Sequence, residues 1–411
     1  MLRLRCGSNA HLSRSLARSA LRISSVRTRR RHPHGGRRTR GGFQPPHCPN
    51  PNCPHHFSAE DWHFVRNGSF LRPSDGRRFP LFRCATCRRG FSSRTFSTTY
   101  WLRRRDLLRP IACWISEGPA LRQLARVLKV SHTTVARQLA RLGRHCLLFH
   151  LQLLASDPLF RLREPLVIDG FESFAYSQYF PFHLNLAAGA TSCFLYAFND
   201  SPLRRKGRMT SFQIHRRMEL ETRFGRPDPK AIERAIGALL RELLALLPPG
   251  ERLDLHSDDH PAYQRAIQGL PREKDCPRIH HSITSSKERR TTSNPLFPVN
   301  LADLRIRHGQ ANHRRETIAF SKRRQAAIER MAVFLVWANC VKRKSEKGGQ
   351  ETSAMAVGLL ARRLGWAQIL KRRLFPRHAK LSPVWRDYYE RIVKMPIFEG
   401  REAVHACAYA F

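Results

Sequence analysis

The chain is 411 residues long, which is enough for two or three domains with a sizeable core. It carries 74 Lys and Arg against 31 Asp and Glu, a formal net charge of +43 at pH 7, which excludes an ordinary metabolic enzyme as the default. A polyanionic partner is indicated, most commonly nucleic acid, with a solubilising surface or a membrane-surface binder as alternatives. The longest apolar run, Met331 to Val341, contains Asn339 and is shorter than the ~20 residues that span a bilayer, so no membrane-spanning helix is expected.

Residues 1–45 hold twelve Arg and no Asp or Glu, a composition typical of a disordered basic arm. Three interpretations stay open for this segment. It is an Arg-rich transit peptide, a phosphate-binding arm, or upstream sequence included by a start codon placed too early.

Four of the eleven cysteines form two close pairs within residues 46–97. The pairs are Cys48 with Cys53 and Cys84 with Cys87, and each pair presents two thiolates to one ion. Four thiolates satisfy tetrahedral Zn²⁺ and close the site, so the pattern predicts a structural zinc ribbon in a reducing compartment. The alternatives are four unrelated free cysteines, or replacement of one thiolate by His47, His55 or His56.

Residues 98–155 are predicted to be helical, with helices over 101–115, 120–128 and 133–142. The last two have the pattern of a helix-turn-helix, in which Ser131 is the N-cap of the second helix. That helix is expected to present polar and basic side chains to a major groove and its phosphates: His132, Thr133, Thr134, Arg137, Gln138 and Arg141. The alternative is a helical hairpin with a solvated basic face.

Residues 160–342 are predicted to form a mixed α/β domain. Short apolar runs at 166–168, 183–188, 193–198 and 252–256 are expected strands, and the period of residues 230–247 predicts a helix.

Two of these expected strands end in carboxylates, Asp169 and Asp258. Carboxylates at the ends of adjacent strands can share divalent metal ions, and two Mg²⁺ ions about 3.5–4 Å apart support phosphoryl transfer on a nucleic-acid backbone. The alternative is that both are strand-end residues that accept backbone N–H bonds.

Over residues 46–342 the chain resembles bacterial insertion-sequence transposases that have an N-terminal zinc ribbon, a helix-turn-helix and a DDE catalytic domain. The resemblance rests on the two cysteine pairs and on four sequence blocks in order: Phe82 to Phe91, Asp169 to Phe174, Ser257 to Tyr263 and Arg315 to Lys322. It implies a ribonuclease-H-like fold, Mg²⁺ dependence, and cleavage and strand transfer of double-stranded DNA at terminal inverted repeats and a target. It also implies a homo-oligomer in the DNA complex and a bacterial cytoplasmic, nucleoid-associated location.

The family's third catalytic residue is usually a Glu, and the matching position in this chain is near Asn300. Asn offers a carbonyl oxygen to Mg²⁺ but no charge, so weaker metal binding is expected. This departure favours an alternative function, a catalytically impaired DNA-binding protein derived from a transposase. Other candidates for the third ligand are Asp303 and Glu316; Asp259 is the alternative to Asp258, and Glu172 is expected on the opposite strand face from Asp169.

The basic block Arg314 to Arg324 is expected to hold DNA near the site through Arg314, Arg315, Lys322 and Arg323. Its alternative interpretation is the wet face of a long helix whose packed face is formed by Ile318, Ala327, Met331, Phe334 and Leu335. Residues 343–411 are expected to be a basic C-terminal tail. A further hypothesis, a zinc-ribbon transcription factor that binds a small ligand, has little support because no phosphate-binding loop is present.

Overall fold

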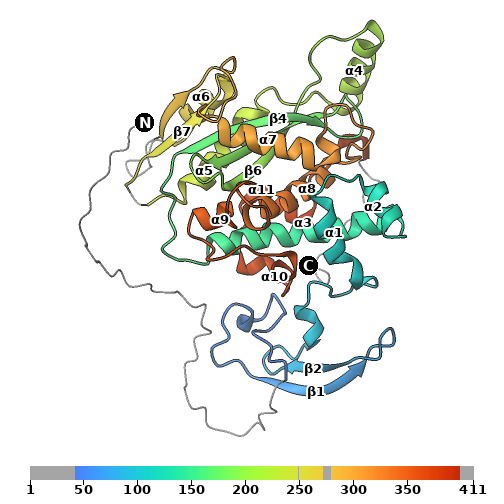
Figure 1. Ribbon diagram of the computed structural model, residues 1–411. Coiled ribbons are helices and arrows are strands. Elements are labelled where there is room, and N and C mark those ends of the chain that lie inside the picture. The colour runs from blue at the N-terminus through green and yellow to red at the C-terminus, as the bar shows by residue number, and fades with distance from the viewer. Residues whose placement is uncertain (1–41, 249, 272–278, 399–411) are drawn as a thin grey trace, which may run out of the picture. The chain divides into compact units, whose positions relative to one another are not determined.

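A computed structural model of the protein describes residues 42–248, 250–271 and 279–398 (Figure 1). The basic arm expected over residues 1–45 therefore lies outside the described residues, apart from residues 42–45. The described residues contain a three-stranded sheet, a five-stranded sheet and helices, so the expected mixed α/β organisation is confirmed at that level.

The first sheet is small and antiparallel, with the strand order β1-β2-β3. Its core is aromatic and sulfur-rich, and Phe82 and Phe91 are buried beside the cysteines. So small a core gains little from apolar burial alone, which is why such domains usually depend on a metal ion or on disulfides. Its elements are η1 (Pro54–His56), β1 (Phe64–Leu71), β2 (Arg78–Cys84), β3 (Gly90–Ser92) and η2 (Ser93–Phe96).

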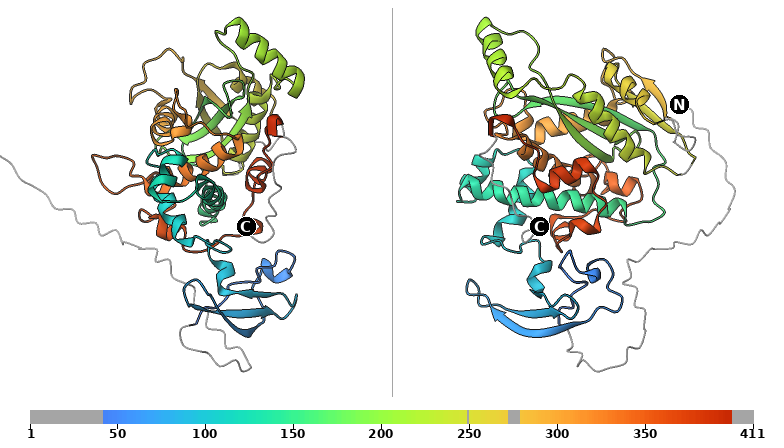
Figure 2. Two further views of the ribbon diagram at one scale, coloured as in Figure 1. Left: turned by 90° about the vertical axis from the view of Figure 1, so that its right-hand side faces the viewer. Right: turned by 180° about the vertical axis from the view of Figure 1, so that it is seen from behind.

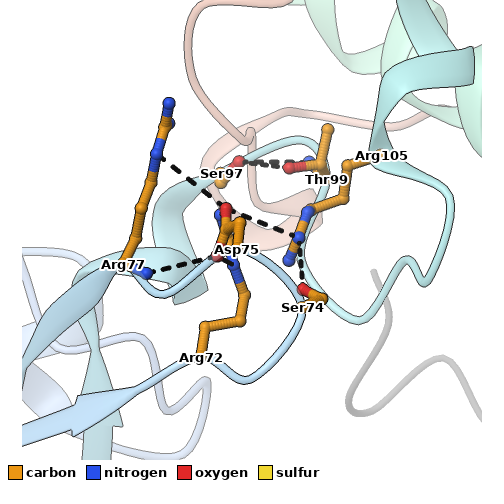
Figure 3. Close-up of polar contacts among 7 residues, drawn as sticks. All are labelled: Arg72, Ser74, Asp75, Arg77, Ser97, Thr99 and Arg105. Atoms are coloured by element: carbon orange, nitrogen blue, oxygen red, sulfur yellow. Dashed lines mark hydrogen bonds and ion pairs between the residues drawn. The ribbon is translucent and has the colours of Figure 1, made fainter.

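The loop between β1 and β2 is organised around Asp75 (Figure 3). Arg72 Nε donates to Asp75 Oδ1 at 2.5 Å, and hydrogen bonding by Arg72 lowers the pKa of this carboxyl to about 2. Arg105 lies 3.8 Å from the same carboxylate and donates to Ser74 Oγ at 2.9 Å. Since Arg105 begins η3 (Arg105–Leu107), the loop contacts the segment that leads into the helices.

The next three helices are α1 (Leu108–Ile115), α2 (Leu121–Val127) and α3 (His132–Leu154). The turn between α2 and α3 is the predicted one: Lys129 has a φ of 51°, and the side chain of Ser131 accepts from the Thr134 N–H at 3.2 Å. Leu124 and Val135 are buried where the two helices pack.

Two predicted helix bounds were wrong. The first helix begins at Leu108 and not at Trp101, because Trp101 has a φ of 62°, outside the helical region. The third continues to Leu154 and does not end at Leu142, because Cys146, Leu147 and Leu148 provide a further buried stripe.

The second sheet has the strand order β6-β5-β4-β7-β8. β4, β5 and β6 pair antiparallel, whereas β7 pairs parallel with both β4 and β8. This topology is compatible with the ribonuclease-H-like domain that the resemblance implies. The strands are β4 (Leu166–Phe174), β5 (Pro181–Gly189), β6 (Leu195–Pro202), β7 (Leu253–Ser257) and β8 (Ile279–Ile283).

Helices pack on this sheet and extend from it (Figures 1 and 2). α5 packs on β5 and β6, α7 packs on β4 and β5, and α8 packs along α3. The helix α4 projects away from the sheet and has no buried residues. The helices are α4 (Ser211–Phe224), α5 (Ala231–Leu244), α6 (Pro261–Gln268), α7 (Phe297–Gly309) and α8 (Arg324–Val336), with η4 (Ala311–His313) after α7.

The segment expected to be a C-terminal tail instead contributes to the core as far as it is described, up to residue 398. Trp366, Trp385 and Tyr388 are buried, and Trp385 Nε1 donates to Phe198 O in β6 at 2.9 Å. The expectation of a tail rested on the basic charge of this segment, which gives no information about its buried aromatic side chains. The elements are η5 (Trp337–Val341), α9 (Ser353–Ala356), α10 (Trp366–Ile369), η6 (Pro376–His378), α11 (Pro383–Glu390) and η7 (Pro396–Phe398).

The close approach of α3 and α8 depends on Gly143. A Cβ at this position would lie 2.6 Å from Glu329 O and 2.9 Å from Glu329 Cα, both backbone atoms that cannot swing aside. Gly237 in α5 is also helical and buried, but a Cβ there would meet nothing nearer than the flexible end of Arg241 at 3.7 Å.

We therefore expect opposite effects from the same substitution at these two glycines. Gly143→Ala should lower the free energy of unfolding by about 1–3 kcal/mol through overpacking. Gly237→Ala should raise it by about 0.5–1 kcal/mol, because Ala loses less backbone entropy in a helix. Urea denaturation of the two variants beside the wild type measures both, and a neutral Gly143→Ala would contradict the tight helix crossing.

Candidate functional site

Asp169 and Asp258 are brought together by the parallel pairing of β4 with β7. The register matches Val167 with His256 and Ile168 with Ser257, so the next residue on each strand is a carboxylate. Because the partners run in the same direction, Asp169 and Asp258 lie at neighbouring positions of one sheet edge. Both side chains are partly buried.

The surroundings of Asp169 fix its orientation. Its Oδ1 accepts from the Gly170 N–H at 2.7 Å, and the hydroxyl of Tyr263 in α6 approaches the carboxylate and contributes to lowering its pKa. Gly170 must be glycine, since a Cβ there would lie 2.1 Å from Leu184 O on β5. Tyr263 is buried, so its hydroxyl orients the carboxylate from inside the protein.

Asp303 is the carboxylate that α7 brings toward Asp169. The helix packs on the face of β4 that carries Asp169 and Phe171, and the Arg307 guanidinium lies 5.0 Å from the centre of the Phe171 ring. Asp303 is partly buried, and its Oδ1 has no hydrogen-bond partner among the described residues. A buried carboxylate oxygen without a donor is the kind of group that a cation would satisfy.

Burial, and to a lesser extent a neighbouring carboxylate, raise the pKa values of Asp169 and Asp303. Burial raises the pKa of Asp169 to about 6, and the Asp258 carboxylate adds to the rise. Burial raises the pKa of Asp303 to about 8, and the Asp169 carboxylate adds to that rise. Arg290 opposes both shifts, so a cationic side chain already partly offsets the negative charge. Carboxyls that hold protons this tightly are typical of functional clusters.

The other acidic candidates lie outside this group. Asp259 is exposed and accepts from Ser286 Oγ at 3.4 Å, and Glu316 is exposed between η4 and α8. Glu172 is exposed opposite His183 in the strand register. Asn300, the position matched by the resemblance, is partly buried one helical turn before Asp303. Asp303 is the acidic residue of α7 whose carboxylate interacts with that of Asp169.

The group is open and not closed around one ion. The three carboxylates do not place all of their ligand atoms within 4.8 Å of one another. Groups of His or Cys side chains that meet this distance occur elsewhere in the described part of the chain. Carboxylate oxygens are the ligands that Mg²⁺ prefers, so the donor set fits such ions.

The four paired cysteines do meet. Cys48, Cys53, Cys84 and Cys87 place their Sγ atoms within 4.8 Å of one another, and the Cys48–Cys87 and Cys53–Cys84 distances are 3.7 and 3.9 Å. A tetrahedron with Zn–S bonds of ~2.3 Å has S–S edges of about 3.8 Å. The group can therefore hold zinc, and no histidine is needed to replace a thiolate.

Hydrogen-bond donors make the thiol of Cys84 more acidic than an ordinary cysteine, with a lowered pKa. Burial opposes ionisation, but the Cys87 N–H at 3.5 Å and the Trp62 indole N–H at 3.3 Å donate to its sulfur, and its pKa falls to about 6. Such N–H donors stabilise a metal-bound thiolate.

The predicted recognition helix is only partly available to DNA. His132, Thr133 and Arg137 are exposed on α3, and Thr134 is partly buried. The expectation that Gln138 and Arg141 face outward was wrong. Gln138 Nε2 donates to Arg104 O at 2.8 Å, and Arg141 donates to Thr98 O at 3.1 Å and to Tyr100 O. Both side chains are buried because the segment before α1 covers that face of α3.

The basic block between α7 and α8 is not helical, so its interpretation as the wet face of one long helix was wrong. The helix starts at Arg324, and Ile318, expected on the packed face, is fully exposed. Ala327, Met331, Phe334 and Leu335 are buried as expected. Of the basic side chains expected to hold DNA, Arg323 is partly buried. The other three are exposed: Arg314, Arg315 and Lys322.

Two residues of the acidic site escaped the sequence analysis. Tyr263 lies in the first turn of α6, shortly after Asp258. Its closeness in sequence to Asp258 could have identified it as a neighbour of the acidic site. Arg290 lies in the loop before α7 and had no signal beyond its charge.

No family model matches the chain, and a search of curated proteins finds no match. Among solved structures, one similar chain comes from the cryo-EM structure of the simian T-cell lymphotropic virus intasome in complex with PP2A regulatory subunit B56 gamma. It is 13% identical, with a TM-score of 0.22 over 67% of this chain and 77% of that chain. In the described residues, no helix has both the length and the apolar character needed to cross a bilayer.

The raised pKa of Asp303 predicts a dependence of stability on pH in magnesium-free protein. The folded state keeps a proton on Asp303 up to about pH 8, whereas the unfolded chain loses it near 3.8, so this group lowers stability as pH rises between those values. Asp303→Asn should therefore be more stable than wild type at pH 8, by at least ~1.4 kcal/mol, the value of one pKa unit.

Urea denaturation at pH 8 and near pH 4 measures the effect, and the difference should vanish at the lower pH. Glu316→Gln, at an exposed carboxyl, is the matched control and should change little at either pH. An Asp303→Asn variant that is less stable than wild type at pH 8 would contradict the burial of this charge.

Proposed function

We propose that the chain is an enzyme that cuts and joins DNA with divalent metal ions bound at Asp169, Asp258 and Asp303. One observation carries this proposal: the parallel register of β4 and β7 makes Asp169 and Asp258 neighbours, and α7 adds Asp303 beside Asp169. A group of carboxylates at one sheet edge, in a chain with a net charge of +43, suits a reaction on a polyanion.

Each residue has a distinct task in this proposal. Mg²⁺, when bound, would supply activation of a water or a 3′-hydroxyl and stabilisation of the leaving oxygen. Asp169 and Asp258 would hold the ions, and Asp303 would complete the acidic group through its unpartnered oxygen. Tyr263 keeps the Asp169 carboxylate oriented, and Arg290 offers a positive charge for a backbone phosphate.

In its finer form, the proposal is a DDE-type transposase of an insertion sequence. The helix α3 and the ribbon around the cysteines, with structural zinc, would bind terminal inverted repeats, and Arg314, Arg315, Lys322 and Arg323 would hold DNA near the carboxylates. The chain would act as a homo-oligomer on two DNA ends and a target. This finer form rests on the sequence resemblance, and the third acidic residue would be Asp303.

The second candidate function is a DNA-binding protein that has lost catalysis. Asn300 favours it, because an amide at the family's acidic position lacks charge. Asp303 weighs against it, since a carboxylate one turn later interacts with Asp169. Vigorous cleavage by the wild-type protein would end this second candidate.

A cleavage and strand-transfer assay on DNA that carries the ends of the element tests the catalytic group. Asp169→Asn, Asp258→Asn and Asp303→Asn should each lower Mg²⁺-dependent activity by at least ~100-fold, more than changes outside a metal's direct ligands usually cost. Asn300→Ala should stay within about tenfold of wild type. Asp259→Asn is the matched control, because Asp259 is exposed beside Asp258.

Unchanged activity in both the Asp169 and the Asp258 variants would eliminate this site. A large loss in Asn300→Ala with full activity in Asp303→Asn would return the third role to Asn300.

DNA binding through α3 predicts a dependence on Arg137. Arg137→Ala should weaken specific binding by about 1–3 kcal/mol if the guanidinium reads a base, or lower the salt slope by about 1 if it contacts phosphate. Fluorescence anisotropy at several salt concentrations measures both. Arg161→Ala, at an exposed arginine between α3 and β4, is the control, and a flat salt response of the wild type would contradict phosphate contacts.

A further inference from the structure

Three histidines from distant parts of the sequence meet beside the cysteine group. His47 precedes Cys48, His56 ends η1, and His378 ends η6. The ring centroids are 5.2 Å apart for His47 and His56, and 4.5 Å apart for each of the two pairs with His378. One ring nitrogen of each histidine lies within 4.8 Å of the others.

The hydrogen bonds identify which nitrogens are free to bind an ion. His47 Nδ1 and His56 Nδ1 both bond to Cys48 O, at 3.0 and 2.8 Å, and His378 Nε2 bonds to His56 O at 2.7 Å. His47 Nε2, His56 Nε2 and His378 Nδ1 remain. A metal-binding histidine usually donates its other ring N–H to a carbonyl or carboxylate, and all three rings have such a partner.

The buried Nε2 of His56 independently indicates a missing ligand. His56 is 1% exposed, and its Nε2 is buried without a hydrogen-bond partner in the described part of the chain. A buried polar atom left unpaired costs free energy, so a ligand there would remove a penalty. Because its Nδ1 is already bonded to Cys48 O, Nε2 is the atom through which His56 would bind an ion.

Neighbouring residues hold the three rings in place. The Phe375 ring lies 4.9 Å from His47 and 5.5 Å from His56, centroid to centroid. Arg377 donates to Pro51 O at 2.6 Å, which fixes the chain next to His378. The outer edge of the cluster is open, since His378 is exposed, so an ion has a route in from solvent.

The cysteine group does not need these rings. Four thiolates already complete a tetrahedral zinc site, so the three imidazoles beside it are not needed as ligands there and can bind a different ion. Three imidazole nitrogens with one open position match the ligand set of known zinc sites, and imidazole is a preferred ligand of Zn²⁺.

We propose that His47, His56 and His378 form a second Zn²⁺ site, separate from the cysteine site, with a fourth position open to water or an incoming ligand. The ion fastens the segment around His378 to the cysteine-bearing sheet. Cys48 takes part in both sites: its Sγ belongs to the cysteine group, and its carbonyl oxygen accepts from two of the imidazoles.

Metal counting on the full-length chain tests the site without reference to DNA. The protein is saturated with Zn²⁺, freed of unbound ion, and analysed by atomic absorption. Wild type should bind about two ions per chain, and His378→Ala and His47→Ala about one each. His55→Ala is the matched control, because His55 adjoins His56 but lies outside the cluster, and it should still bind about two.

Substitution with Co²⁺ separates loss of the site from loss of folding. Thiolate-to-cobalt charge-transfer absorption reports the cysteine site alone and should be equal in wild type and His378→Ala. Absorption from the imidazole-bound ion should disappear only in the variant. One ion per chain in the wild type, or two in both histidine variants with intact thiolate absorption, would overturn the proposal. If His378→Ala also lost the thiolate absorption, the same two measurements on His47→Ala would decide the proposal: one ion per chain with intact thiolate absorption supports it, and two ions overturn it.

Discussion

The parallel pairing of β4 with β7 is the constraint on which the rest of the acidic site depends. A slip of one residue would turn one carboxylate to the opposite face of the sheet and separate it from the other. The register is held by buried apolar side chains on both strands, including Val167, Ile168 and Leu255. Apolar packing therefore fixes the positions of two neighbouring carboxylates, and the pKa of Asp169 is raised first by burial and further by the Asp258 carboxylate.

Much of this arrangement was predictable from sequence. Apolar runs that end in Asp identified β4 and β7, and paired cysteines identified the sulfur group. The sequence alone does not choose between Asn300 and Asp303, because the choice depends on how α7 is rotated about its axis against β4. Alignment with a family pattern gives position along the chain, whereas contact with Asp169 depends on helix phase.

The errors share a physical cause. Gln138 and Arg141 have the periodicity of an exposed helix face, but backbone carbonyls of a distant segment accept from them. Ile318 is apolar yet fully exposed, and Trp385 is buried in a segment judged by its charge. For Gln138, Arg141 and Trp385 the contacting residues are remote in sequence, so composition and local period carry no information about them.

The length of α3 has a mechanical consequence. The helix runs from its exposed first turn at His132 to Leu154 without a break, and its later turns pack on α8 within the same core that supports the sheet. With a rise of about 1.5 Å per residue, it is a rigid rod of roughly 35 Å. Under the proposed function, this rod would hold the exposed first turn of α3 at a fixed place relative to the core, because the helix itself contains no hinge.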